Sequence, residues 1–387
     1  YKRQFPLWYN QETEGVRTDA RVCNLSYLQT DWYIDQMRRP AYDSPSLPIS
    51  WTRLQYVTGT REGIPVQPDA LQQVIDYYKD SPEDLKQMLG DNPYELKNII
   101  RHWVLNDNPD LQIFPTDSIV VTVDKEAVKR SGMMIAADSI PDVMHISLKG
   151  KRAVYKSEMM MLEMISQANW ERPLYMSTTV GPDNYGHLGD NFVQEGLACR
   201  ITPFDTKQSG RTIDSERMYN NMMNKFKYGG LKENPDIYLD ETVIRMCYTH
   251  RRLFNQLAQQ LLKEGQKDKA LKVLQRAEEE IPGSIVPHEA FYGHSLELAD
   301  AWLALGHKAE AEKLLNAVGQ NAKEYIEWYL SLNTQRLLQS SRECLMQIYI
   351  LNDIAKTWEP IDKKKAETYR MEVNNYASRC HQRGMSL

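Results

Sequence analysis

The sequence contains few of the motifs by which a catalytic function is usually recognised. Its 387 residues hold no Gly-x-Gly-x-x-Gly following a strand, no phosphate-binding loop ending in Gly-Lys-Ser or Gly-Lys-Thr, no His-Glu-x-x-His and no Gly-x-Ser-x-Gly. These motifs are typical of dinucleotide binding, nucleoside triphosphate binding, zinc proteases and α/β-hydrolases. The sequence therefore argues against those classes of function.

Long hydrophobic runs and positive charge are also missing. No run approaches the roughly 18 apolar residues that a transmembrane helix needs, and the richest run, residues 159–165, contains Glu163. The formal net charge is -5 at pH 7, with 42% hydrophobic and 26% charged residues. We expect the chain as given to be soluble and globular, and we expect no nucleic-acid binding because there is no basic field.

Paired cysteines are absent as well. The five cysteines include no Cys-x-x-Cys pair and have no histidine at a metal-ligand spacing. We expect neither a zinc site nor any cofactor, and we interpret these cysteines as scattered core residues. Because the number of cysteines is odd, at least one thiol is free. Cysteine usage therefore does not indicate whether the chain resides in an oxidising or a reducing compartment. The cysteines are Cys23, Cys199, Cys247, Cys344 and Cys380.

Short β-branched runs in the first half of the chain predict strands that alternate with helices. A helix beginning near Ser157 and ending near residue 168 lies between two of them. Alternation of this kind favours a mostly parallel sheet flanked by helices. The first predicted strand follows a helix with no strand before it, so the α/β unit would lack its opening strand. The predicted strands are residues 20–25, 118–123, 143–148, 173–180 and 198–202.

The strand pattern disappears after about residue 205, and the rest of the chain predicts helices. The Asn-Pro-Asp sequence at residues 234–236 predicts a turn that connects the first domain to a second one. We therefore expect two domains, an α/β domain at residues 1–235 and a helical domain at residues 236–387.

The helical domain carries two sets of residues at the offsets of a tetratricopeptide repeat, in which two antiparallel helices pack through small residues. An insertion at residues 283–293 separates the sets, and a third helix pair, at 345–357 and 363–377, would cap the array. The helices would either brace the first domain or form a groove for a protein or peptide partner. The first set is Phe254, Leu257, Ala258, Leu261, Gly265, Ala270, Leu274, Ala277 and Pro282, and the second is Leu298, Ala299, Trp302, Gly306, Ala311 and Leu315.

One loop, residues 181–191, gathers polar side chains after a predicted strand, where open parallel sheets place ligands. Its acids and its histidine are candidates for acid, base or metal-ligand roles, and its tyrosine for stacking on a glycan. Glycine and Asp-Asn pairs are equally common in turns, so a purely structural loop remains the alternative. The ligand-binding candidates are Asp183, Asn184, Tyr185, His187 and Asp190.

Other polar residues are weaker candidates. Asn24 and Ser26 end the first predicted strand and would share the same sheet edge, and Glu195 is predicted one turn into a following helix. His288 and His294 are separated by a spacing that does not place both on one helical face, so we expect no metal pair there.

Four segments, residues 5–39, 155–176, 179–204 and 216–231, resemble the C-terminal soluble region of a bacterial multi-pass membrane-protein family. That family was long of unknown function and is grouped with protein O-mannosyltransferases. The resemblance implies a preceding membrane region, an extracytoplasmic (periplasmic) location and tetratricopeptide-like helices at the end. Related sequences tend to carry an acidic run at the position that residues 1–4 occupy in this chain. We transfer no catalytic residue from the family to this chain.

The resemblance and the missing motifs together predict an extracytoplasmic domain of a membrane-anchored, glycosyltransferase-like protein. We expect this part to be non-catalytic alone and to bind an acceptor, a protein partner or the membrane portion of its own full-length chain. The alternative is a carbohydrate-binding module or carbohydrate-active enzyme that uses the loop at residues 181–191. A purely structural scaffold is a third hypothesis.

Overall fold

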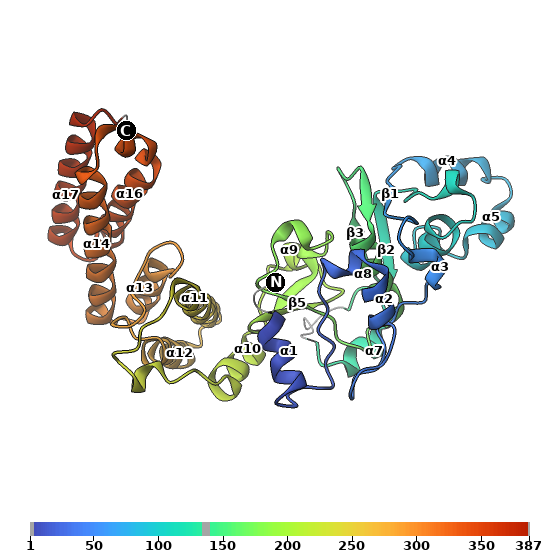
Figure 1. Cartoon of the computed structure of the whole chain (residues 1–387), viewed down its shortest axis with the longest axis horizontal. Helices are drawn as coiled ribbons and strands as arrows, with labels where there is room; N and C mark the ends of the chain where they lie inside the picture. Colours follow the sequence, from blue (N-terminus) through green and yellow to red (C-terminus); the bar gives the residue numbers. More distant parts are fainter. Residues whose placement is uncertain (1–3, 134–139, 386–387) are drawn as a thin grey trace. The chain divides into compact units, whose positions relative to one another are not determined.

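The computed structural model describes residues 4–133 and 140–385, which divide into two compact units, Tyr1–Asp214 and Ser215–Leu387 (Figure 1). The contacts of the segment after Asp214 explain where the division falls. The hydroxyl of Ser215 donates to Glu264 at 2.7 Å, and the Tyr228 ring stacks on Phe254. The segment that leads into the long helices therefore belongs with them.

The described residues of the first unit form three small antiparallel sheets, whose strands are three to five residues long. Residues 195–197 join β6 directly to β7, so this pair is a hairpin and has to be antiparallel. The pairs are β1 (Gly63–Pro65) with β4 (Ala153–Tyr155), β2 (Ser118–Thr122) with β3 (Val143–Ser147), and β7 (Ala198–Ile201) with both β5 (Tyr175–Ser177) and β6 (Phe192–Gln194).

The prediction of a mostly parallel sheet flanked by helices is wrong for the described residues. All named strands pair antiparallel, and parallel pairing occurs only as isolated bridges such as Glu95 with Val120. Residues 20–25, predicted as the first strand, form an irregular segment that ends in a turn. The part of the first unit that the structure describes therefore contains no α/β unit with a missing opening strand. Strands this short leave most of the core to be covered by helices and loops.

Helix α8 (Lys156–Ala168) is the centre of the first unit. Every side chain from Met159 to Ile165 is buried, as expected of a helix covered on all sides. Glu163 is fully buried too, and its Oε1 accepts hydrogen bonds from the amide of Ser50 at 2.8 Å and from the Ser50 hydroxyl at 2.6 Å. A buried carboxylate is thus compensated by hydrogen bonds.

The remaining helices of the first unit are short. They are α1 (Gln4–Glu12), α2 (Asp31–Met37), α3 (Arg53–Tyr56), α4 (Ala70–Tyr77), α5 (Pro82–Leu89), α6 (Leu96–Ile99), α7 (Lys125–Arg130) and α9 (Thr206–Ser209). Leu71 of α4 and Leu89 of α5 belong to a second, smaller apolar cluster.

The second unit is helical throughout, and its helices pack as consecutive pairs. Gly265 and Gly306 have φ angles of 74° and 82° and form the turns of the first two pairs, a conformation that glycine adopts without strain. The third pair confirms the predicted helices near the chain end. The helices are α10 (Ser215–Asn220), α11 (Glu241–Lys263), α12 (Lys267–Glu280), α13 (Ser295–Ala304), α14 (Lys308–Ser331), α15 (Thr334–Gln339), α16 (Ser341–Trp358) and α17 (Lys363–Gln382).

Between α12 and α13 runs an irregular connection that Arg251 holds in place. The guanidinium of this buried arginine donates to three carbonyl oxygens, those of Ile281 at 3.0 Å, Val286 at 2.8 Å and Pro287 at 3.0 Å. The insertion predicted at residues 283–293 is therefore an ordered part of the helical unit. None of the helices in the described ranges combines the length and the apolar character needed to cross a bilayer.

Candidate functional site

The loop singled out in the sequence connects β5 to β6. It contains two short 3-10 turns, Pro182–Asn184 and Gly189–Asn191. Because β5 belongs to an antiparallel sheet, the argument that placed this loop at the carboxyl edge of a parallel sheet is wrong. Tyr185 is half-buried, and the exposed candidates are Asp183, Asn184, His187 and Asp190.

Apolar contacts hold the loop against the core beneath it. The Tyr185 ring packs edge-on against Phe192 with 4.9 Å between ring centroids. Gly186 is buried at a φ of 56°, and a Cβ there would lie 2.9 Å from Cε of Met161. The loop therefore presents polar side chains to solvent from a fixed backbone.

His187 is the loop residue whose surroundings change its chemistry most clearly. Although the side chain is exposed, partial desolvation of the ring lowers its pKa, the Lys151 ammonium lowers it further, and Glu158 opposes them. Lys151 and Glu158 form an ion pair with each other. His187 is therefore neutral at pH 7. The described residues contain no group of three or more His, Cys, Asp or Glu side chains arranged to hold a metal ion.

Asn24 has a structural role in its own segment. Its side-chain oxygen accepts hydrogen bonds from the amides of Ser26 at 2.9 Å and Tyr27 at 3.3 Å. These bonds shape the turn that replaces the predicted strand.

Glu195 lies in the turn between β6 and β7, so its predicted place in a helix is wrong. Its carboxylate is buried, accepts a hydrogen bond from the Tyr175 hydroxyl at 2.7 Å and lies 4.0 Å from Nη1 of Arg200. Glu195 thus links the β6–β7 turn to Tyr175 of β5 and lies near Arg200 of β7.

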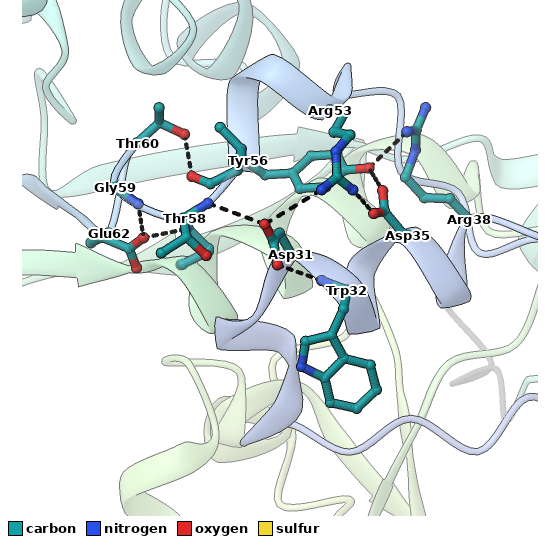
Figure 2. A network of polar contacts seen from close by, with 12 residues as sticks. Asp31, Trp32, Asp35, Arg38, Arg53, Tyr56, Thr58, Gly59, Thr60 and Glu62 are labelled. Carbon is teal, nitrogen blue, oxygen red and sulfur yellow. Dashed lines mark hydrogen bonds and ion pairs between the residues drawn. The ribbon is translucent and has the colours of Figure 1, made fainter.

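A polar network that the sequence did not reveal lies around α2 (Figure 2). Asp31 and Asp35 are one helical turn apart, and Arg53 forms ion pairs with both carboxylates, at 3.7 Å in the case of Asp31. The hydroxyl of Tyr56 donates to Oδ1 of Asp35 at 2.6 Å and accepts from Arg38 at 2.9 Å. These contacts tie α2 to α3.

Backbone amides keep the first carboxylate of the network ionised. The amides of Thr58 and Trp32 donate to Asp31 and lower its pKa, and the Arg53 charge adds to this effect. Asp31 thus carries its negative charge at neutral pH.

Glu62 and Lys156 extend the network towards α8. Oε1 of Glu62 accepts from Nζ of Lys156 at 2.6 Å and from the amide of Gly59 at 2.9 Å. Burial raises the pKa of Glu62, but these two donors outweigh it and leave the pKa below its ordinary value. Glu62 is therefore charged at neutral pH.

Trp32 gives this network an aromatic surface. Its side chain is 54% exposed, while its ring lies tilted against Tyr27 and near-perpendicular to Tyr33, at centroid distances of 5.7 and 5.5 Å. Figure 2 shows the indole directed away from the carboxylates, so Trp32 joins the network through its backbone amide, which donates to Asp31. An exposed indole of this kind suits contact with a sugar ring or a partner protein. We call Asp31, Trp32, Asp35 and Arg53 the Trp32 surface.

A comparison with protein-family models gives a match over the first part of the chain. A family model described as TMEM260-associated domain 2 matches residues 2–221, which is more than half of the chain. No curated protein matches the chain, and no solved structure does either. The matched range includes the Trp32 surface and the loop at residues 181–191.

Proposed function

The chain belongs to the TMEM260-associated domain 2 family, and from this membership we propose that it is the extracytoplasmic domain of a membrane-anchored, glycosyltransferase-like protein. In this proposal the domain binds an acceptor or a partner and does not catalyse sugar transfer by itself. The match over residues 2–221 is the observation that carries the proposal.

The Trp32 surface supports a binding role. Its carboxylates already accept hydrogen bonds and ion pairs from Arg53, Tyr56 and backbone amides, which suits a fixed contact surface more than proton transfer. Trp32 supplies exposed apolar area of the kind that dominates binding energies. We propose this surface as the contact with the acceptor or with the membrane portion of the parent protein.

The second unit supports a partner-binding role of its own. Its long helices pack as consecutive pairs, and several of its large aromatic side chains are exposed, including Tyr325, Trp328 and Tyr349. We propose that these helices bind a protein or peptide partner.

The test combines an activity assay with a binding assay on residues 1–387. Incubation with a lipid-linked sugar donor and an acceptor polypeptide, or with aryl glycosides, is expected to give neither transfer nor hydrolysis. The immobilised chain is expected to retain the separately produced membrane portion of the parent. Trp32→Ala should weaken this retention, whereas Tyr77→Ala, which removes another exposed ring, should not. Sugar transfer by the chain alone would refute the proposal.

Glycan binding by the loop at residues 181–191 is the second candidate function. The exposure of its polar side chains above the half-buried Tyr185 favours it. Binding on a glycan array that Asp183→Ala abolishes, and that Trp32→Ala leaves intact, would support this alternative over the Trp32 surface.

A further inference from the structure

Two cysteines far apart in the sequence meet inside the last helix pair. Cys344 lies near the beginning of α16 and Cys380 near the end of α17. Their sulfur atoms are 3.9 Å apart, and both side chains are fully buried. Because α16 and α17 pack against each other and are joined by a short turn, this contact lies at the end of the pair away from that turn (Figure 1).

The separation of the sulfurs is small enough for a covalent bond to form by local adjustment. A disulfide needs a sulfur–sulfur distance of about 2 Å, so the two atoms must approach by roughly another 2 Å. Rotation of a side chain about its Cα–Cβ bond from one staggered rotamer to another moves its sulfur over a comparable distance.

We propose that Cys344 and Cys380 are an oxidative modification site, at which a small-molecule disulfide such as oxidised glutathione converts the two thiols into a disulfide bond. The bond joins the beginning of α16 to the end of α17 and closes the open end of this helix pair. The proposal does not depend on the function proposed above.

The reaction proceeds by two thiol–disulfide exchanges. The thiolate of one cysteine attacks a sulfur of the small-molecule disulfide, forms a mixed disulfide and releases one small thiol. The thiolate of the other cysteine then attacks the protein sulfur of the mixed disulfide and releases the second small thiol. The protein loses two electrons and two protons, and the small-molecule disulfide gains both.

Burial controls when this exchange takes place. Desolvation raises the pKa of Cys344 to about 12, with a further contribution from Cys380, and desolvation raises the pKa of Cys380 as well. Thiolate, the attacking species, is therefore scarce in the folded protein. Exchange is expected to be slow in the native state and faster while the chain folds or when the helix pair opens.

The bond also has a stability consequence. The cysteines are separated by 36 positions, so a disulfide between them restricts the unfolded chain over most of α16 and α17. The oxidised protein is expected to unfold at a higher urea concentration than the reduced protein, and a reductant should remove the difference.

The experiment refolds the full 387-residue chain from urea in mixtures of oxidised and reduced glutathione, then alkylates the remaining thiols and measures the intact mass. We expect three alkylated cysteines after refolding in oxidised glutathione and five after refolding in reduced glutathione. Peptide mapping should identify one cross-link, between the peptides that contain Cys344 and Cys380.

Matched variants separate the pair from the other cysteines. Cys344→Ala and Cys380→Ala should each keep all four remaining thiols, and reductant should no longer change their urea midpoints. Cys199→Ala should still lose two thiols. If the alanine variants fail to fold, the cross-link map of the unchanged chain decides alone. Five alkylated cysteines after oxidative refolding, or a cross-link between any other pair, would overturn the proposal.

Discussion

The ammonium group of Lys156 is fully buried and donates a 2.6 Å hydrogen bond to Glu62, whose side chain remains 52% exposed. The pair joins the first residue of α8 to the segment before β1. The lysine relies on its partner more than the glutamate does, since only the lysine has lost its contact with water.

Glu62→Ala should therefore lower the free energy of unfolding by about 2 kcal/mol, less than the cost of breaking a fully buried pair because Glu62 is half-exposed. Lys156→Met should cost less, because no buried charge is left without a partner. Urea denaturation measures both. Glu126→Ala removes an exposed ion pair with Lys129 and should change stability by less than about 0.5 kcal/mol. An effect of Glu62→Ala no larger than this control would contradict the prediction.

The same glutamate should contribute to acid sensitivity. Burial raises its pKa, but Lys156 and the Gly59 amide lower it more, so the folded-state pKa lies below the unfolded-state value. Its contribution to stability is then complete above about pH 4.5 and is lost as the pH falls through the folded-state pKa. Glu62→Gln should make the unfolding free energy fall less steeply below pH 5. Identical slopes for this variant and the unchanged protein would argue against the assignment.

Tyr56→Phe should destabilise the first unit by about 1–2 kcal/mol, because it removes the buried hydroxyl that bonds to Asp35 and Arg38 while keeping the ring. Tyr77→Phe removes an exposed hydroxyl and serves as the control. Thermal or urea unfolding distinguishes the two variants, and equal stabilities would show that the hydroxyl bonds contribute nothing.

Gly283 has no room for a side chain, because a Cβ there would lie 2.4 Å from Nε2 of the buried His288. Gly283→Ala should cost about 1–3 kcal/mol through overpacking. Gly229→Ala, where a Cβ meets nothing within 4 Å, should be close to neutral. In a double-mutant cycle His288→Ala should relieve part of the Gly283→Ala cost, and strictly additive costs would contradict the proposed clash.

Arg251→Met should destabilise the second unit by about 3 kcal/mol, since it leaves three carbonyl oxygens of the α12–α13 connection without their buried donor. Arg245→Met, on the exposed part of the same helix, should cost little. Limited proteolysis should also cut residues 283–293 faster in the Arg251 variant. Unchanged cutting would mean that other contacts hold this connection.

The sequence predicted local structure best where the residue pattern was strong. The β-branched runs at residues 118–123 and 143–148 are confirmed as β2 and β3, and the helical periodicity near the chain end is confirmed as α16 and α17. The run at residues 20–25 was too short for its pattern to decide, because the hydrogen bonds of Asn24 compete with strand pairing.

The candidate site was only partly predictable. The loop at residues 181–191 could be recognised by its polar, glycine-rich composition. Most of its polar side chains are exposed to solvent in the structure, as expected of a loop. The network around α2 was missed because Arg53 and Tyr56 come from a segment without a regular pattern. The four-residue spacing of Asp31 and Asp35 predicts that both carboxylates lie on one face of a helix. This spacing does not predict that Arg53 is the residue that pairs with them.

The amino-acid sequence by itself determined the helices of the second unit and the positions of its turns, because periodicity and glycine placement are local properties. Only the tertiary structure decided that the strands pair antiparallel, that Lys156 meets Glu62, and that Cys344 meets Cys380. Each of these outcomes depends on which distant segments pack together, and burial of the shared core sets that packing for the chain as a whole.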